Sequence, residues 1–284
     1  MRALCGHGIV VLVLVAFIAW VDHVLKLGRQ QHALDRLLRN ALATITPDVA
    51  YAFGALAWDG VTPQDGVPVA HADVGRVVTI DTAALQRIAD EHGVEVVVTV
   101  RPGDTVEPTT PVLYVVGEDR QRVADTCGDE LACAIATDRQ RTQDQDVRFN
   151  ITLLAETADR ALSPGVNDPG TAIVVLDLLL ELFVEWARVR REAVGAEVRA
   201  RRVRVPVLTA EELVRDAFGP IARDGAAVVE VGVRLQKVLA ALRRLPDHEL
   251  AEAATAMSRI ALEFADRALV LPAQRAMLDT ARSM

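Results

Sequence analysis

The fold is decided by residues 160–186, RALSPGVNDPGTAIVVLDLLLELFVEW, which join two predicted helices through one tight corner. Pro164 and Gly165 are expected to end the first helix, because proline has no backbone donor and glycine suits helix ends. Asp168 is expected to cap the second helix, with Pro169 at its first position. That second helix is apolar on almost every side, which indicates a buried central helix of a helical domain.

The corner itself is a candidate functional site. Ser163, Asn167, Asp168 and Thr171 surround the free backbone amides of a helix start, and such a start can bind an anion or a partner's carboxylate. The alternative interpretation is purely structural, because a tight corner between two helices needs Pro, Gly, Asn and Asp for backbone reasons. Both interpretations stay open from the sequence.

A line of carboxylates follows on the central helix. Asp177, Glu181 and Glu185 recur every four residues and so share one face, here named the acidic stripe. The stripe is interpreted as the solvated edge of the buried helix. In a ring-shaped oligomer the same stripe would line a cation path.

The amino terminus carries an apolar run from Ile9 to Val21, which as a helix is roughly 20 Å long. We interpret it as an uncleaved transmembrane anchor, with a cleaved signal peptide or a buried helix as alternatives. Lys26, Arg29, Arg36 and Arg39 follow it, so the positive-inside rule places the carboxyl-terminal bulk in the cytoplasm. Because one short span is a marginal anchor, we expect a homo-oligomer, or further spans upstream, and contact with membrane lipid.

The sequence predicts an α+β fold that is predominantly helical. Residues 1–45 are predicted to form a transmembrane anchor and juxtamembrane helix, followed by a turn-rich connector without regular elements at 46–73. A small β-rich subdomain is predicted at 74–138 and a helical domain at 139–284. In the third segment β-branched runs predict strands around a short helix, with the strands at Arg76–Ile80, Val94–Val100 and Val112–Val116 and the helix at Thr82–Glu91.

Helix starts in the last segment are predicted from capping residues. Thr142 with Gln145, and Thr209 with Glu212, match the capping-box pattern, and Asp247 is placed to open a later helix. Seven arginines lie between Arg188 and Arg204. They would attract anionic headgroups near a membrane. Alternatively, they form a solvated loop and an edge strand, because Arg202 to Val205 alternate with period two.

Composition excludes several functional classes. The chain of 284 residues has 31 basic and 39 acidic residues and a net charge of −8, which argues against nucleic-acid binding. Its three cysteines lack a C-x-x-C pair, which favours a reducing compartment, and its six histidines show no metal-ligand spacing. We therefore expect no metal and no cofactor. No phosphate loop, dinucleotide motif or Ser-His-Asp order indicates an enzyme.

Four strings carry a resemblance. The chain contains V-x-x-I-D (Val77 to Asp81), R-P-G-D-x-V (Arg101 to Val106), R-T-x-x-Q-D (Arg141 to Asp146) and R-A-L-S-P-G-V-N-D-P (Arg160 to Pro169). Over about residues 9–280 it resembles the bacterial predicted membrane proteins of domain of unknown function 2254. Members of that family have several transmembrane helices before the cytoplasmic portion, and the chain begins at what would be the last of them. The resemblance implies the bacterial inner membrane and no established activity.

These observations predict an integral membrane protein whose cytoplasmic body senses, assembles or binds a partner of unknown identity, without catalysis. One alternative is an oligomeric ion or solute channel or transporter subunit that uses the acidic stripe. A second alternative is a membrane-tethered hydrolase at the corner of Ser163 to Asp168.

Overall fold

The computed structural model describes residues 14, 17 and 32–283. Apart from Leu14 and Phe17, the apolar run of the predicted anchor lies outside the described residues. Within the described part of the chain, no helix combines the length and the apolar character needed to cross a membrane. Residues 32–44 are helical and lead into the body at Ile45.

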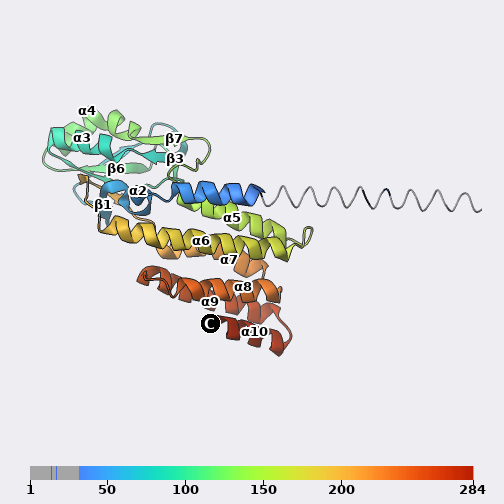
Figure 1. Cartoon of the computed structure of the whole chain (residues 1–284). Helices are drawn as coiled ribbons and strands as arrows, with labels where there is room; N and C mark the ends of the chain where they lie inside the picture. Colours follow the sequence, from blue (N-terminus) through green and yellow to red (C-terminus); the bar gives the residue numbers. More distant parts are fainter. Residues whose placement is uncertain (1–13, 15–16, 18–31, 284) are drawn as a thin grey trace, which may run out of the picture.

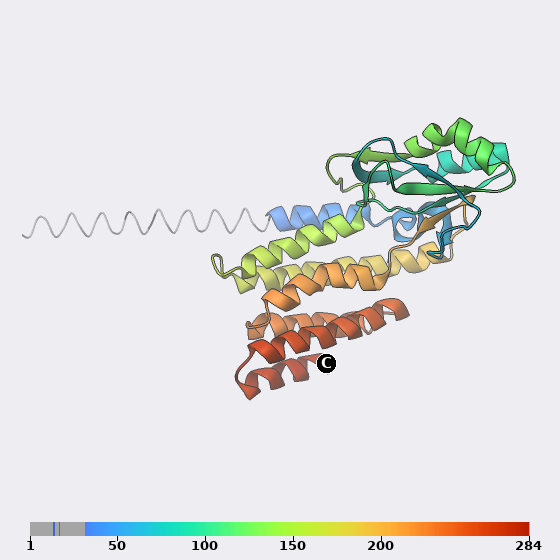
Figure 2. The ribbon, with the colours of Figure 1, turned by 180° about the vertical axis from the view of Figure 1, so that it is seen from behind.

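The fold is α+β and predominantly helical, as predicted. At one end two helices lie over a mixed five-stranded sheet, next to a three-stranded antiparallel sheet. The remaining helices stack below in antiparallel layers (Figures 1 and 2). The elements of the first half are α2 (Pro47–Ala50), η1 (Ala52–Gly54), β1 (Ala55–Trp58), β2 (Val67–Ala70), β3 (Gly75–Ile80), α3 (Thr82–His92), β4 (Glu95–Val98), β5 (Thr105–Val106), β6 (Pro111–Val116), α4 (Arg120–Cys133) and β7 (Ile135–Asp138). The strand order of the three-stranded sheet is β5-β3-β7.

The second half is helical apart from one strand. Its elements are α5 (Val147–Leu162), α6 (Pro169–Val194), β8 (Ala200–Pro206), α7 (Ala210–Asp224), α8 (Val229–Leu242), α9 (His248–Ala268) and α10 (Pro272–Arg282). One continuous hydrophobic cluster extends from the helix at 32–44 through the sheet to α9. Trp186 and Phe183 of α6 lie at its centre, and Phe183 stacks on Phe218 of α7 with ring centroids 5.5 Å apart.

The prediction of an edge strand at Arg202–Val205 is wrong. In the five-stranded sheet the order is β1-β8-β4-β6-β2, so β8 is an interior strand that pairs in parallel with both β1 and β4. Val203 and Val205 are fully buried, while Arg202 and Arg204 point to the other face. The alternation was correctly recognised, but alternation alone does not distinguish a central strand from an edge strand.

Residues 46–73 also differ from the prediction, because they contain regular elements. β1 pairs with β8 and β2 pairs antiparallel with β6, so both strands join the five-stranded sheet as its edges. Strands of only four residues between glycines and prolines give little periodicity to read. Strand pairing thus crosses the predicted boundaries after residues 73 and 138, and the division into separate domains stays a prediction.

Three of the four predicted helix starts are confirmed, the first being that of α6, where Asp168 is the N-cap and Pro169 the first helical residue. Thr209 and Glu212 form a complete capping box on α7, and the Asp247 carboxylate accepts from Leu250 N at the start of α9. The box at Thr142 and Gln145 is wrong, since α5 begins at Val147 and its N-cap is Asp146.

Candidate functional site

The corner identified from the sequence is the loop between α5 and α6. Ser163 Oγ donates to the carbonyl oxygen of Arg160 at 2.7 Å. The Asp168 carboxylate accepts from the backbone nitrogen of Thr171 at 3.1 Å and from its hydroxyl at 2.6 Å. Asn167 is exposed and has a left-handed backbone, with φ of 49°. The four residues therefore lie together and build one turn and one helix cap.

The helix start at this corner is already occupied by a carboxylate. Asp168 caps α6, and Pro169 at the first position has no N–H to offer. An incoming anion would meet the negative charge of Asp168 before it reached the amides of the first turn. The contacts support the structural interpretation of the corner, and a functional role for it stays a prediction.

The acidic stripe lies on the outer side of α6. Asp177 and Glu181 are exposed, and Glu185 is half-buried. Asp177 pairs with Arg234 of α8, and Glu185 pairs with Arg188 one turn later. The hydrogen bond from Arg188 lowers the pKa of Glu185. Arginine thus neutralises two of the three carboxylates, which fits a solvated helix edge better than a cation path.

The arginine-rich segment is engaged in ion pairs within the fold. Six of its seven arginines have a carboxylate partner, namely Arg188, Arg190, Arg199, Arg201, Arg202 and Arg204. The segment runs from the carboxyl-terminal end of α6 into β8, at the end of the body opposite to residue 32 (Figure 1). This position does not support a role in attracting lipid headgroups.

Three of the four family strings meet in space. Gly103 N donates to Val77 O at 2.7 Å, and Val77 N donates to Asp104 O at 2.9 Å, which joins the R-P-G-D turn to β3. Gln145 Oε1 of the third string accepts from Ile80 N at 3.0 Å. The fourth string, at the α5–α6 corner, lies at the far end of α5 (Figure 1).

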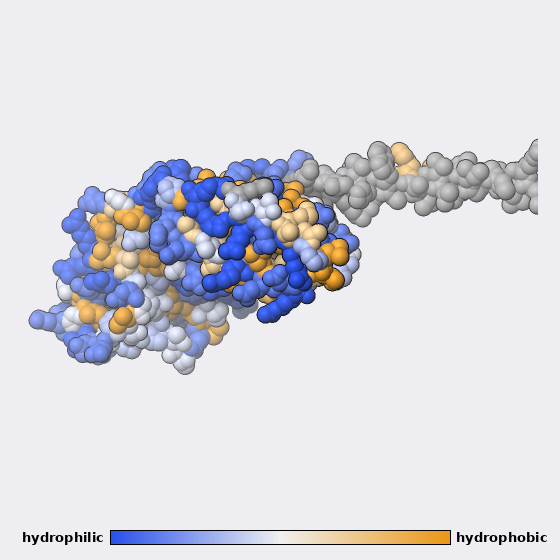
Figure 3. Space-filling view, turned by 90° about the horizontal axis from the view of Figure 1, so that it is seen from below, coloured by the Kyte–Doolittle hydropathy of each residue, from blue (hydrophilic) through white to orange (hydrophobic). Residues whose placement is uncertain are grey.

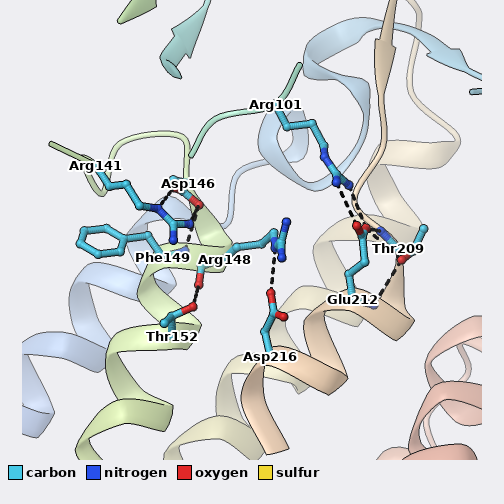
Figure 4. A network of polar contacts seen from close by, with 9 residues as sticks. All are labelled: Arg101, Arg141, Asp146, Arg148, Phe149, Thr152, Thr209, Glu212 and Asp216. Carbon is cyan, nitrogen blue, oxygen red and sulfur yellow. Dashed lines mark hydrogen bonds and ion pairs between the residues drawn. The ribbon is translucent and has the colours of Figure 1, made fainter. Parts of the chain in front are cut away.

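A buried ion pair lies where these strings meet (Figure 4). The Asp146 carboxylate accepts from Arg141 Nε at 2.7 Å and from Arg141 Nη2 at 2.9 Å, and its side chain is only 3% exposed. The same carboxylate caps α5 through Phe149 N at 2.9 Å, and the Arg141 guanidinium lies 4.9 Å from the Phe149 ring centroid. A Cβ on Gly103 would collide with this carboxylate, so the turn requires glycine.

Two further ion pairs connect the sheet and α5 to α7. Arg101 donates to both oxygens of Glu212, at 2.8 and 2.9 Å, and Arg148 Nε donates to Asp216 at 2.8 Å (Figure 4). Burial alone would raise the pKa of Glu212, but hydrogen bonds from Arg101 and Thr209 lower it to about 2. We call this set of six charged residues the junction, comprising Arg101, Arg141, Asp146, Arg148, Glu212 and Asp216.

The helix at 32–44 is fastened to the same region through neutral groups. Thr44 Oγ1 lies 2.8 Å from Gln143 O, and Asn150 Nδ2 donates to Thr44 Oγ1 at 3.0 Å. Asn40 Nδ2 donates to Gln143 Oε1 at 2.9 Å. Thr44 and Asn150 are buried, so these bonds replace water for the Thr44 hydroxyl and for the Nδ2 group of Asn150.

A cleft with a volume of about 870 Å³ lies next to the junction, in the described part of the chain. Its walls come from α2 and η1, from the end of β3 with α3, from the segment before α5, and from the start of β8. Gln145 belongs to both the cleft and the region of the junction. The lining residues are Asp48, Phe53, Thr79, Ile80, Asp81, Thr82, Ala83, Gln86, Arg87, Asp90, Gln145, Arg199 and Ala200.

One wall of the cleft has unusual backbone geometry. Ala52 and Phe53 have φ of 53° and 51°, in the left-handed region that side chains with a Cβ rarely adopt. Phe53 O accepts from the Thr82 hydroxyl at 2.8 Å, and Gly54 O accepts from Arg199 N at 2.9 Å. The Arg199 side chain pairs with Asp48 and lies so close to Gly54 that a Cβ there would collide with it.

The sequence pointed to neither the cleft nor the junction as a site. Arg101, Arg141 and Asp146 stand in the strings that carry the family resemblance, so the signal for the junction was present in the sequence. Asp48 and Arg199 are 151 residues apart and stand in none of the four strings. No group of His, Cys, Asp or Glu suited to hold a metal ion occurs among the described residues.

Comparison with known proteins gives one family and no individual relative. No curated protein and no solved structure matches the chain. A family model described as "Predicted membrane protein (DUF2254)" matches residues 1–241, which include the junction and every residue that lines the cleft. Since the match covers well over half of the sequence, the chain belongs to the DUF2254 family of predicted membrane proteins.

Proposed function

We propose that this chain is a sensing protein of the bacterial inner membrane, whose cytoplasmic body binds a small zwitterionic ligand in the cleft without catalysing a reaction. The volume of about 870 Å³ falls in the range of about 300–1,000 Å³ that small-molecule sites occupy. The family assignment supports the membrane location. The amino-terminal apolar run and the cations after it support the anchor and the cytoplasmic orientation.

The strained turn at Ala52 and Phe53 carries the proposal. A left-handed conformation costs such residues roughly 1–2 kcal/mol each, and the fold retains it at the wall of this cleft, where Phe53 is a lining residue. Strain of this kind gathers at ligand clamps and switch regions, where binding selects between two backbone arrangements. A ligand that contacts this wall can therefore change how η1 lies against β8.

The charges of the lining favour a ligand that carries both signs. Arg87 and Arg199 supply guanidinium groups, while Asp48, Asp81 and Asp90 supply carboxylates. Arg199 pairs with Asp48, Arg87 with Glu130 and Asp90 with Arg202, so a bound ligand exchanges these partly exposed ion pairs for its own. A molecule with one ammonium and one carboxylate group finds a partner for each in this arrangement. A purely anionic or purely cationic molecule would meet like charge on one wall.

The lining supports binding rather than catalysis. The described residues that line the cleft include no Ser, Cys, His or Lys, and the Thr82 hydroxyl already donates to a carbonyl oxygen. At the alternative hydrolase site, Ser163 donates to a backbone oxygen instead of a base. For the alternative channel, the pairing of Asp177 and Glu185 with arginine gives little support.

A thermal-shift screen of the full chain in detergent tests the proposal. The probes are amino acids, dicarboxylates and polyamines, and the variants are Arg199→Ala and Arg201→Ala. Arg201 is the matched control, because its side chain is 73% exposed and it pairs only locally with Glu197. A ligand at 100 times its Kd stabilises by about 2.7 kcal/mol, which for a domain of this size raises Tm by about 5–10 °C.

We expect an amino acid to raise the Tm of the wild type and of Arg201→Ala but not of Arg199→Ala. A shift caused only by dicarboxylates or only by polyamines would refute the zwitterionic class. No shift in the wild type, or an equal shift in both variants, would refute the cleft as the binding site.

We also retain the proposal of a homo-oligomer, with membrane lipid as a further partner. Light scattering of the full chain in detergent tests the oligomer, and a mass equal to one chain plus its bound detergent would refute it.

A further inference from the structure

Exposed aliphatic side chains occupy two loop tips at one end of the body. Val166 of the α5–α6 loop is 52% exposed, and Val270 and Leu271 of the α9–α10 loop are 85% and 58% exposed. Both loops lie at the same end in two opposite views (Figures 1 and 2). Seen from the side of α10, hydrophobic atoms are visible at this end, on the right of the view (Figure 3).

The fold holds both tips in place. Val166 N and Asn167 N donate to Ser163 O at 3.0 and 2.9 Å, which closes the first loop. In the second loop, Arg275 Nε donates to Leu269 O at 2.9 Å. Leu269 is buried and anchors the loop to the core, while Val270 and Leu271 are exposed. The apolar side chains are therefore presented on fixed turns, and exposing Val270 to water brings the folded body no benefit.

The chain enters the body at this same end. The continuous described chain starts at His32, on the first helix, beside the α5–α6 loop (Figures 1 and 2). The 31 residues before it contain the apolar run from Ile9 to Val21, followed by Lys26 and Arg29. A membrane entered by that run would thus lie on the side of the body where the two tips project.

We propose that this end of the body rests on the bilayer, with Val166, Val270 and Leu271 inserted at the boundary between headgroups and acyl chains. Because the exposed side chains lie on two separate loops, they fit a flat surface such as a bilayer better than a protein partner that fills a single groove. Exposed arginines accompany both tips, Arg160 before the first and Arg267 before the second, and both are placed to reach lipid phosphates. The tether at the amino terminus keeps the tips at a high local concentration near the lipid, so weak contacts suffice.

Contact of the two loop tips with the bilayer fixes the orientation of the whole protein and does not depend on ligand binding in the cleft. α6 has 26 residues and runs from the α5–α6 corner to the opposite end, a length of about 39 Å. The cleft is lined by Arg199 and Ala200, just past that far end. In this orientation the cleft lies at the end of the body away from the membrane.

Lipid-depth quenching tests the contact in the full chain. Cys5, Cys127 and Cys133 are changed to serine, and one cysteine is placed at Val166, Val270 or Val194 and labelled with the fluorophore NBD. Val194 is the matched control, because it is 55% exposed and lies at the other end of α6. The protein is reconstituted into vesicles of phosphatidylcholine and phosphatidylglycerol, with and without phosphatidylcholine that carries a nitroxide on its acyl chain.

Interfacial side chains lie about 5–10 Å into the headgroup boundary, so we expect nitroxide lipid to reduce NBD emission about twofold or more at positions 166 and 270. The label at position 194 should keep its emission. Equal quenching at all three positions, or none at 166 and 270, would overturn the proposal. A blue shift at 166 and 270 without lipid quenching would also overturn it, because the tips would then be covered by protein.

Discussion

The Asp146→Asn variant removes one charge from the buried ion pair of the junction and preserves the shape of the side chain. Asp146 is 3% exposed and receives two hydrogen bonds from Arg141, whose side chain is 24% exposed. Removing one member of a buried pair costs about 3–5 kcal/mol, and the partial exposure of Arg141 places the expected loss near about 3 kcal/mol. Asparagine still caps α5 through Phe149 N, whereas Asp146→Ala loses the cap as well, a further loss of about 1 kcal/mol.

The assay is thermal unfolding of the full chain in detergent, followed by tryptophan fluorescence, to which the buried Trp186, 1% exposed, contributes. A loss of about 3 kcal/mol corresponds to a Tm lower by about 6–12 °C for a domain of this size. The control is Asp119→Asn, since Asp119 and Arg122 form an ion pair with both side chains 57% exposed, and solvent screens such a pair so strongly that it adds little to stability. The reasoning is refuted if Asp146→Asn lowers Tm no more than this control.

A double variant distinguishes the loss of the ion pair from other local effects of the Asp146→Asn substitution. Adding Arg141→Met to Asp146→Asn removes the unpaired guanidinium, so the double variant should regain stability relative to Asp146→Asn alone. A double-mutant cycle should give a coupling energy of about 2 kcal/mol or more. Additive losses would show that the two residues do not act as a pair.

The remaining predictions concern other parts of the junction and the corner. Glu212 has a pKa of about 2 in the folded protein against an ordinary 4.5, so its contribution is present above about pH 4.5 and is lost as the pH falls towards 2. With allowance for solvent screening we expect about 2 kcal/mol from this group, and acid titration of Glu212→Gln should lack that part of the pH dependence of stability. Gly103→Ala should lower stability by about 3 kcal/mol in urea unfolding, because φ is 91° and the new methyl group meets the Asp146 carboxylate; an unchanged midpoint would contradict the geometry. Asp168→Ala should cost about 1–2 kcal/mol in the same assay through loss of the α6 cap, while Asp168→Asn should cost less than half of that; equal losses would argue against capping as its role.

Features that depend on neighbouring residues were predictable. The caps of α6, α7 and α9, and the core of β3, α3, β4 and β6, follow from patterns only a few residues long. The cap of α5 was misplaced by four residues because the third family string offers two capping acceptors. The charged Asp146, fixed by Arg141, takes that role, and Gln145 is drawn to Ile80 N instead.

Features that depend on distant partners were not predictable. β1 and β2 are four-residue strands that gain their order from β8 and β6, and nothing in residues 46–73 shows those partners. The central position of β8 likewise depends on both of its neighbours in the sheet. Local propensity is weak for such segments, because pairing across the sheet supplies most of their stability.

The sequence by itself determined the family, the predominantly helical α+β class and the corner between α5 and α6, since these depend on local strings and hydrophobic periodicity. The tertiary structure alone decided the junction, where Arg101 and Glu212 meet across 111 residues, and the cleft, where Asp48 meets Arg199 across 151. It also decided that Val166 and Val270 share one end of the body with the entry of the chain (Figure 1). The physical reason is that a charge or an exposed aliphatic side chain acquires its role from what the folded chain brings near it, and one sequence does not show which distant residues become neighbours.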